Sequence, residues 1–224
     1  KDIHAKYMFA TVQTFSKESH LEQFPKDAFD YIVIDEAHRS SASSYTKIIN
    51  YFEPEFLLGM TATPERTDNN EIFGLFDFNI AYEIRLQKAL EAEILSPFHY
   101  FGVTDYVVNG ETINDTSSLS DLLDQDRIQH IIDKLYYYSH AGEKVRGLMF
   151  VSDREEAHKL SELLNQRGYK TRALTGMNSQ EERQEAVKLL EANKLDYLIT
   201  VDIFNEGVDI PSVNQVVMLR QTES

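Results

Sequence analysis

The 224-residue sequence contains no cysteine, which excludes disulfide bonds, thiolate catalysis and cysteine-ligated zinc sites. It has no apolar run near the roughly 18 residues that a membrane-spanning helix needs. The first residues, Lys1 to His4, show no signal-peptide pattern and do not start with methionine. The missing methionine fits either an edited terminus or a segment of a longer chain. Together these absences predict a cytoplasmic protein that does not enter a membrane.

Basic residues are also scarce, since 22 Lys and Arg stand against 37 Asp and Glu, for a formal net charge of −15. A protein held on nucleic acid by charge alone is basic, so this balance argues against a simple nucleic-acid-binding module. It does not exclude a motor, which can hold a strand in a local groove with few cations and many backbone amides. The length suits one large domain or two smaller ones.

The first half of the chain alternates apolar strands with more polar segments. Strands are predicted at residues 7–12, 29–34 and 56–60, and a short helix over residues 85–93. The near-continuous apolar character of residues 29–34 suits a strand that is buried on both faces, as in a parallel sheet. Parallel strands joined by helices, and therefore the α/β class, are the natural prediction.

The second half repeats this alternation more clearly. Capping boxes at Asp153–Glu156 and Ser179–Glu182 predict the starts of two helices. The other predicted elements are a strand at 98–103, a polar excursion over 104–125 with a turn at Asn109-Gly110, a helix on which Ile128, Ile131, Ile132 and Leu135 share one face, and strands at 147–151, 197–201 and 213–219.

Two adjacent carboxylates, Asp35 and Glu36, directly follow the strand at 29–34. Open α/β sheets bind ligands at the carboxyl ends of their strands, so this pair is a candidate site. One carboxylate can hold Mg²⁺ through water, while the other orients and deprotonates an attacking water. Taken alone, however, such a pair is more often a solvated acidic turn.

The residues that follow this pair favour a catalytic site over a solvated acidic turn. Asp35-Glu36-Ala37-His38 resembles motif II, the Walker B motif, of the DEAH-box branch of superfamily 2 helicases. Thr61-Ala62-Thr63 resembles motif III, whose hydroxyls link the ATP site to the nucleic-acid site in that family, with His38 as a coupler. Thr11 and Gln13 resemble the Thr-x-Gln segment that faces the nucleic-acid backbone, where hydroxyl and amide groups suit phosphate contacts. In isolation, the last two patterns also fit a helix cap and a strand-end turn.

Two further motifs of the family have counterparts in the second half. Ser152, after the strand at 147–151, resembles motif IV, where a helix N-terminus offers backbone amides to a phosphate or the residue acts as an N-cap. Thr175, in Leu174-Thr175-Gly176, resembles the motif that follows. Both residues are therefore candidate nucleic-acid contacts.

Residues 205–211, Asn-Glu-Gly-Val-Asp-Ile-Pro, resemble motif V. Gly207 permits close backbone approach to a phosphate, and Asp209 would accept hydrogen bonds from a ribose or position the domain interface. Many relatives have Thr-Asp where this sequence has Val201-Asp202. Either one hydroxyl contact to nucleic acid is lost, or Thr200 supplies it.

The resemblance spans residues 7–219 and is nearest to the helicase subunits of type III restriction enzymes. It implies two RecA-like parallel-sheet domains, residues 1–95 and 96–224, the first of them truncated, with ATP and Mg²⁺ in the cleft between them. It implies a nucleic-acid strand as partner, DNA in this branch, and allows restriction or repair partner subunits. The implied roles are catalysis by Asp35, Glu36 and His38, Mg²⁺ binding through water by Asp35, ATP binding and coupling by Thr61, Thr63, Gly207 and Asp209, and nucleic-acid binding by Thr11, Gln13, Ser152, Thr175 and Thr200.

The sequence contains no Gly-x-x-x-x-Gly-Lys-Ser/Thr loop, by which this family holds the β- and γ-phosphates. The resemblance places that loop before Lys1 and the motif VI arginines after Ser224. We therefore expect these 224 residues alone to bind ATP weakly and to hydrolyse it hardly at all. We also expect an unpaired sheet edge beside the strand that ends at Thr61, which favours self-association.

The competing hypothesis is a helicase-like scaffold or interaction module without catalysis. Asp35 and Glu36 argue against it, because a scaffold has no need of both carboxylates. The residues do not distinguish DNA from RNA as the substrate, nor strand unwinding from translocation alone.

Overall fold

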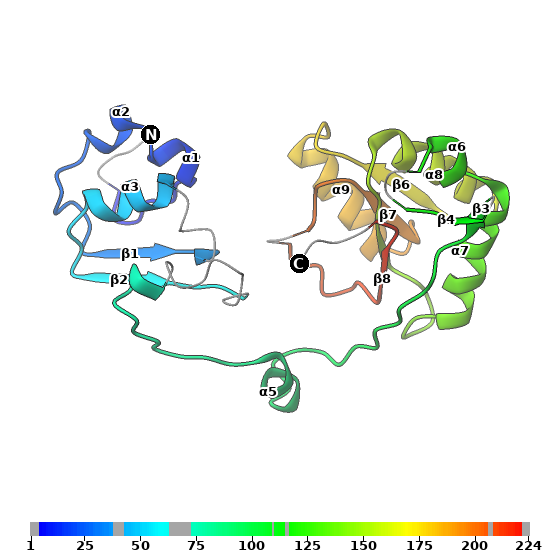
Figure 1. Cartoon of the computed structure of the whole chain (residues 1–224), viewed down its shortest axis with the longest axis horizontal. Coiled ribbons are helices and arrows are strands. Elements are labelled where there is room, and N and C mark those ends of the chain that lie inside the picture. Colours follow the sequence, from blue (N-terminus) through cyan, green and yellow to red (C-terminus); the bar gives the residue numbers. More distant parts are fainter. Residues whose placement is uncertain are drawn as a thin grey trace. The chain divides into compact units, whose positions relative to one another are not determined.

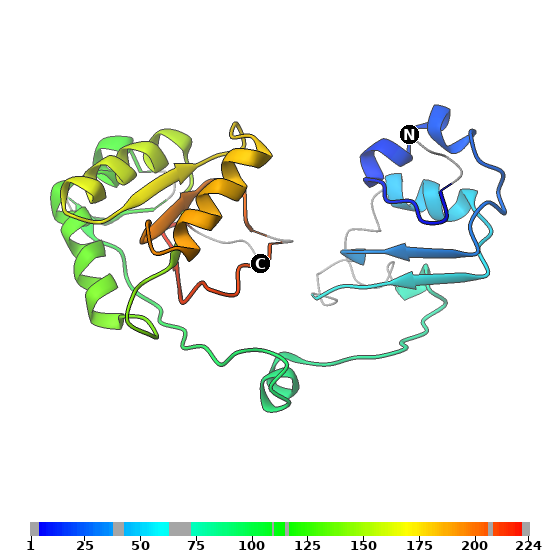
Figure 2. The same ribbon diagram turned by 180° about the vertical axis from the view of Figure 1, so that it is seen from behind.

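The computed structural model consists of two compact units, residues 1–97 and 98–224, each with its own parallel sheet (Figures 1 and 2). No helix in the described part of the chain is both long enough and apolar enough to cross a membrane. The structure describes residues 5–37, 43–62, 73–108, 110–114, 117–205 and 208–220.

The first unit is built around two parallel strands, in which Ile34 of the first is in register with Gly59 of the second. A helix lies between these strands in sequence, as the crossover between parallel strands requires. The strands predicted at 29–34 and 56–60 are therefore present. The elements are α1 (Val12–Phe15), α2 (Glu18–Leu21), β1 (Tyr31–Ile34), α3 (Ser43–Tyr51) and β2 (Phe56–Gly59).

Aromatic rings fill the core of the first unit. Phe52, which follows α3, is buried and stacks on Phe15 with 5.7 Å between ring centroids. It also meets Phe29 edge-on at 5.0 Å. Ile32 of β1 packs against this cluster, whereas its neighbour Tyr31 points the other way and is 69% exposed. The alternation follows from the period of two residues along a strand.

Helix α5 (Leu86–Glu91) is the predicted helix of residues 85–93, and it precedes the second unit. The strand predicted at residues 98–103 is wrong, because these residues form no regular element. A short hairpin follows, made of β3 (Val107–Val108) and β4 (Glu111–Thr112), with a positive φ of 87° at Gly110. The predicted turn at this glycine is therefore confirmed. A single-turn helix, α6 (Leu119–Leu122), leads into the main part of the unit.

The second unit has a four-stranded parallel sheet with the strand order β6-β7-β5-β8. Its strands follow helices in sequence, which confirms the predicted α/β class. The elements are α7 (Gln125–Tyr138), β5 (Gly147–Phe150), α8 (Arg154–Gln166), β6 (Thr171–Leu174), α9 (Gln180–Glu191), β7 (Tyr197–Thr200) and β8 (Gln215–Met218).

Helices cover both faces of this sheet (Figures 1 and 2). On one face, Met149 of β5 and Ile199 of β7 pack against α7 and α8. On the other face, Leu148 and Leu198 pack against α9. Successive residues of β5 and β7 thus point to opposite faces and are buried on both, which explains why these strands are continuously apolar.

Close packing also explains one glycine of the sheet. A Cβ atom at Gly147 would lie 2.2 Å from the ring of Tyr197, its register partner on β7. Only glycine leaves room for this ring. Burial raises the pKa of the Tyr197 phenol, whose hydroxyl donates a hydrogen bond to Gln215 on β8.

Two further parts of the sequence folded differently from the prediction. Residues 7–12 are not a strand: Phe9 is 96% exposed, and helix α1 begins at Val12. A short apolar run becomes a strand only where a neighbouring strand completes its hydrogen bonds, and no such neighbour exists among the described residues. Conversely, β6 was not predicted, because Thr171-Arg172-Ala173-Leu174 mixes polar and apolar residues.

Candidate functional site

The carboxyl ends of β1 and β2 bring the two motifs of the first unit together. Asp35 and Glu36 follow β1, and Thr61 comes two residues after β2. The backbone N–H of Ala37 donates to the Met60 carbonyl at 2.9 Å, which fixes the two chain segments side by side. Because the strands are parallel, residues 25 positions apart in sequence lie at one edge of the sheet.

The backbone at this edge has an uncommon conformation. Glu36 has a positive φ of 51°, a region that residues other than glycine seldom adopt. Its N–H donates to the Asp35 carboxylate at 3.0 Å. Asp35 is exposed and Glu36 half-buried, so the two adjacent carboxylates have different surroundings. Such backbone outliers cluster at functional sites.

An exposed carboxylate at a strand end fits an ion of the Mg²⁺ type, which binds few protein groups and keeps several waters. No group of three or more His, Asp or Glu side chains that could hold a metal is found among the described residues. The exposed carboxylate of Asp35 therefore fits an ion that is held mainly through water. His38 and Thr63 lie outside the described residues.

Thr11 and Gln13 are both exposed and lie at the start of α1. Thr11 is the N-cap residue, but its side chain makes no capping bond to the helix. Its hydroxyl instead donates to the Thr14 hydroxyl at 2.9 Å. The two predicted contact residues are therefore accessible, on a helix start and not on the strand end that was expected.

In the second unit, Ser152 follows β5, but its polar atoms are already engaged. Its N–H and its hydroxyl both donate to the Glu156 carboxylate, at 3.2 and 3.1 Å. The next residue, Asp153, caps α8 by accepting from the N–H groups of Glu155 and Glu156. Two carboxylates of the chain therefore occupy the helix terminus where a phosphate seat was predicted.

The other two predicted contact residues of this unit are buried. Thr200 is fully buried inside β7, and its hydroxyl donates to the Met149 carbonyl at 3.4 Å. Thr175 is 3% exposed, and its hydroxyl accepts the N–H of Met177 at 3.3 Å. In this conformation neither hydroxyl reaches solvent. Asp209 is exposed, and Gly207 lies outside the described residues.

A buried ionic network that the sequence did not predict lies beneath Ser152. Arg127 of α7 is 1% exposed, and its guanidinium donates to both oxygens of Asp105 at 2.7–3.2 Å. It also lies 3.6 Å from Glu156, which is fully buried. Burial raises the pKa of Glu156 above its ordinary value, and the Arg127 charge and the Ser152 hydrogen bonds offset this only in part. The sequence pattern placed Glu156 only in a capping box and did not single out Arg127.

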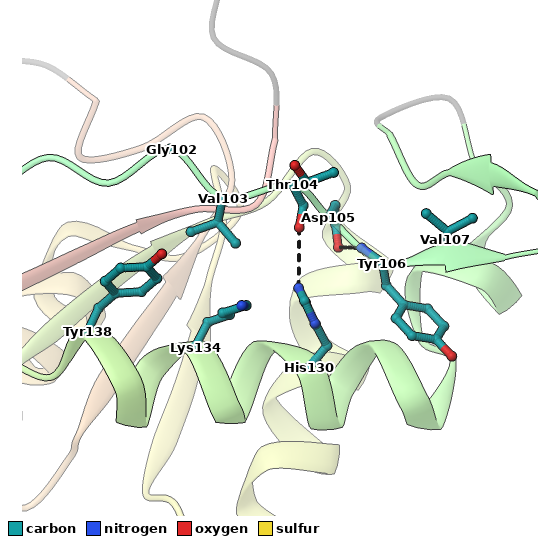
Figure 3. Close-up of a pocket in the computed structure, with 9 residues that line it drawn as sticks. All are labelled: Gly102, Val103, Thr104, Asp105, Tyr106, Val107, His130, Lys134 and Tyr138. Carbon is teal, nitrogen blue, oxygen red and sulfur yellow. Dashed lines mark hydrogen bonds between the residues drawn. The ribbon is translucent and has the colours of Figure 1, made fainter.

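A shallow depression of about 500 Å³ lies apart from these strand ends (Figure 3). It is bounded by α7, with His130 and Lys134 pointing toward the segment of residues 102–107. At one end, Tyr138 stacks on Phe101 with 4.4 Å between ring centroids. It contains none of the predicted site residues.

Two family models match separate parts of the chain. Residues 1–66 match the res subunit of type III restriction enzymes, and residues 126–224 match the helicase conserved C-terminal domain. IRC3 of Saccharomyces cerevisiae, assigned as an ATP-dependent helicase, is 26% identical over 227 residues, which cover 96% of this chain and 32% of IRC3. DEAD-box ATP-dependent RNA helicase 5 of Arabidopsis thaliana is 27% identical over 191 residues, with 84% and 32% covered. The chain spans about a third of the length of these relatives.

Among solved structures, Dbp5 of S. cerevisiae bound to RNA and ADP BeF3 is similar in fold, with a TM-score of 0.56 and 16% sequence identity. The similarity covers 92% of this chain and 48% of that chain. Both units are parallel α/β folds, and adjacent carboxylates stand at the end of β1. With the matches over residues 1–66 and 126–224, these findings show that the chain belongs to the superfamily 2 helicases.

Proposed function

We propose that this chain is part of an ATP-dependent helicase or translocase that moves on nucleic acid. The observation that carries the proposal is the juxtaposition of Asp35 and Glu36 with Thr61 at one edge of the β1–β2 pair. In this proposal, residues 1–95 and 96–224 are the two RecA-like domains. The tetrad Asp35-Glu36-Ala37-His38 supports the DEAH-box branch.

The two carboxylates divide the proposed reaction. Asp35, exposed at the strand end, holds the waters of a Mg²⁺ ion. When bound, that ion neutralises charge on the β- and γ-phosphates. Glu36, half-buried and next to Asp35 in the chain, orients the attacking water and accepts a proton from that water. The hydrogen bond from the Ala37 N–H to the Met60 carbonyl connects this site to Thr61. We assign Thr61, together with His38, Thr63, Gly207 and Asp209, to coupling ATP hydrolysis to movement on nucleic acid.

The substrate strand is proposed to run over exposed groups of both units, with Thr11 and Gln13 as the contacts in the first unit. The match of residues 1–66 to a restriction-enzyme subunit supports DNA, whereas several relatives are named as RNA helicases. A comparison of ATPase stimulation by single-stranded DNA and by RNA of the same length would decide between them.

The test of the proposal is the substitution Glu36→Gln in the full-length protein. It keeps the size and polarity of the side chain but removes the proton acceptor. Nucleic-acid-stimulated ATP hydrolysis should fall by about 10²- to 10⁴-fold, the usual contribution of a general base, while ATP binding is retained. Glu53→Gln, an exposed glutamate of the same unit, is the matched control and should leave the rate unchanged. Wild-type turnover by Glu36→Gln would rule out the proposed mechanism.

A further inference from the structure

Arg220 lies at the carboxyl edge of the second sheet, two residues after β8. The N–H of Leu219 donates to the Phe150 carbonyl at 2.8 Å, so the chain leaves the sheet directly beside the end of β5. Arg220 forms an ion pair with Asp202, which follows β7. Since β5 lies between β7 and β8, and neighbouring strands are about 4.8 Å apart, the arginine side chain must reach across the end of β5.

This half-buried guanidinium has few polar partners among the described residues. Its side chain is 21% exposed, whereas that of Asp202 is 76% exposed. Among the described residues, its one polar contact joins Nη1 to the Asp202 carboxylate at 3.3 Å, which is long for a charge-assisted hydrogen bond. Its Nε is buried and has no hydrogen-bond partner among the described residues. Arginine offers five N–H donors in a planar fork, so most of this capacity is available to an anion.

Unlike Arg220, the neighbouring hydrogen-bond donors at this edge are already engaged within the chain. The donors of Ser152, which follows β5, are taken by Glu156, and the first N–H groups of α8 are capped by Asp153. An anion arriving at the end of β5 would therefore find the helix terminus occupied and the guanidinium of Arg220 available. The carboxyl edge is also where open α/β sheets bind their ligands.

We propose that Arg220 binds a phosphate group at the carboxyl end of β5, and that Asp202 holds the guanidinium in place until the phosphate displaces it. The phosphate belongs either to the nucleic-acid strand or to the nucleotide, so the inference rests on the proposed function. The fork of an arginine matches two oxygens of a phosphate, and an exposed, weakly bound carboxylate such as Asp202 is easily displaced.

The test compares Arg220→Gln with Arg172→Gln in the full-length protein. Arg172 lies within β6, away from the carboxyl edge, and pairs with Glu185 at 3.2 Å, so both substitutions remove one paired arginine from the same unit. Binding of a fluorescein-labelled single-stranded (dT)20 is measured by anisotropy over a range of salt concentrations. Binding of a fluorescent ATP analogue with Mg²⁺ is measured separately. Thermal unfolding confirms that both variants are folded.

If the phosphate is in the strand, Arg220→Gln should bind (dT)20 about ten-fold more weakly, and the slope of log affinity against log salt should fall by about 0.7. If it is in the nucleotide, the loss should appear with the ATP analogue alone. Either result supports the proposal and identifies the source. Asp202→Asn should strengthen the same interaction by about two-fold, because it removes a carboxylate that competes with the phosphate.

Arg220→Gln variants that match Arg172→Gln in both titrations would overturn the assignment of Arg220 while the proposed function stands. Wild-type protein that binds neither (dT)20 nor the ATP analogue would overturn the proposed function, and this inference with it. Arg220→Lys separates charge from geometry, since it keeps the positive charge but loses the fork and should recover only part of the affinity.

Discussion

At the scale of single residues, the second unit buries a carboxylate that the sequence placed only in a capping box. Glu156 is fully buried, and one of its oxygens has no hydrogen-bond partner among the described residues. Arg127 lies 3.6 Å away and is held mainly by Asp105. Burying a charge costs more than such a distant partner returns, so the pKa of Glu156 is raised.

The raised pKa predicts how stability depends on pH. Because folded Glu156 binds its proton more tightly than the unfolded chain, its contribution is fully present below the ordinary value of 4.5 and is lost as pH rises through the raised pKa. Wild-type protein should therefore lose stability relative to Glu156→Gln as pH increases from about 4.5 towards neutrality. Urea unfolding of both proteins at several pH values measures the difference.

The control is Glu155→Gln, because Glu155 is the exposed neighbour on the same helix and pairs with Lys159. The difference in unfolding free energy between Glu155→Gln and wild type should change much less over the same pH range. The interpretation fails if the gap between wild type and Glu156→Gln is constant or changes in the opposite sense.

Sequence patterns predicted that candidate residues follow the strands, but they did not predict what each side chain contacts. The adjacency of Asp35, Glu36 and Thr61 followed from strand order, because parallel strands end at one edge. The engagement of Ser152 by Glu156 could not be read from the sequence, because it depends on where the helix side chain turns after folding. The burial of Thr200 likewise depends on which helices cover β7.

At the scale of elements, helix α9 is the clearest case of local sequence that determines structure. The Ser179 hydroxyl accepts the N–H of Glu182, and the Glu182 carboxylate accepts the N–H of Ser179 at 2.7 Å, which completes the predicted capping box. These backbone contacts lower the pKa of Glu182. Such a cap is formed by neighbours in sequence, so it needs no tertiary information.

Replacing the cap serine should therefore have a graded effect. Ser179→Ala is expected to cost about 1 kcal/mol of unfolding free energy, because a helix N–H loses its acceptor. Ser179→Gly should cost only a few tenths of a kcal/mol, since glycine is itself tolerated at N-caps. Urea unfolding of the two variants gives the comparison, and equal losses would show that capping is not the source of the effect.

Other elements depended on contacts that are distant in sequence. The apolar residues 7–12 had the composition of a strand, but they did not form one. β6 lacks a continuous apolar pattern and is nonetheless a strand, because it pairs with β7 from Thr171 to Leu174. In both cases the presence or absence of a partner strand among the described residues outweighed local preference.

At the scale of the whole molecule, the two units have cores of different size. Among the described residues, the core cluster of the first unit has three buried members, whereas the two clusters of the second unit have eleven and seven. Stability grows with the apolar area removed from water. The second unit should therefore be the more stable one, and each unit should unfold separately.

Two core substitutions test this independence, one in each unit. Leu198→Ala, at a fully buried position of β7, should lower the unfolding free energy of the second unit by about 2–5 kcal/mol. Phe52→Ala should cost the first unit about 3–5 kcal/mol, because it removes the ring on which Phe15 and Phe29 pack. Hydrogen exchange measured on peptides from each unit would report the two losses separately.

The control for both is Leu86→Ala on α5, where the leucine is 55% exposed and little burial is lost. If the units are independent, Leu198→Ala accelerates exchange in residues 98–224 and leaves the slowest amides of the first unit unchanged. If instead it lowers protection equally in both units, the chain unfolds as one cooperative body. Separate unfolding would fit the proposed motor, because two units that keep their own folds can change their relative position without either one opening.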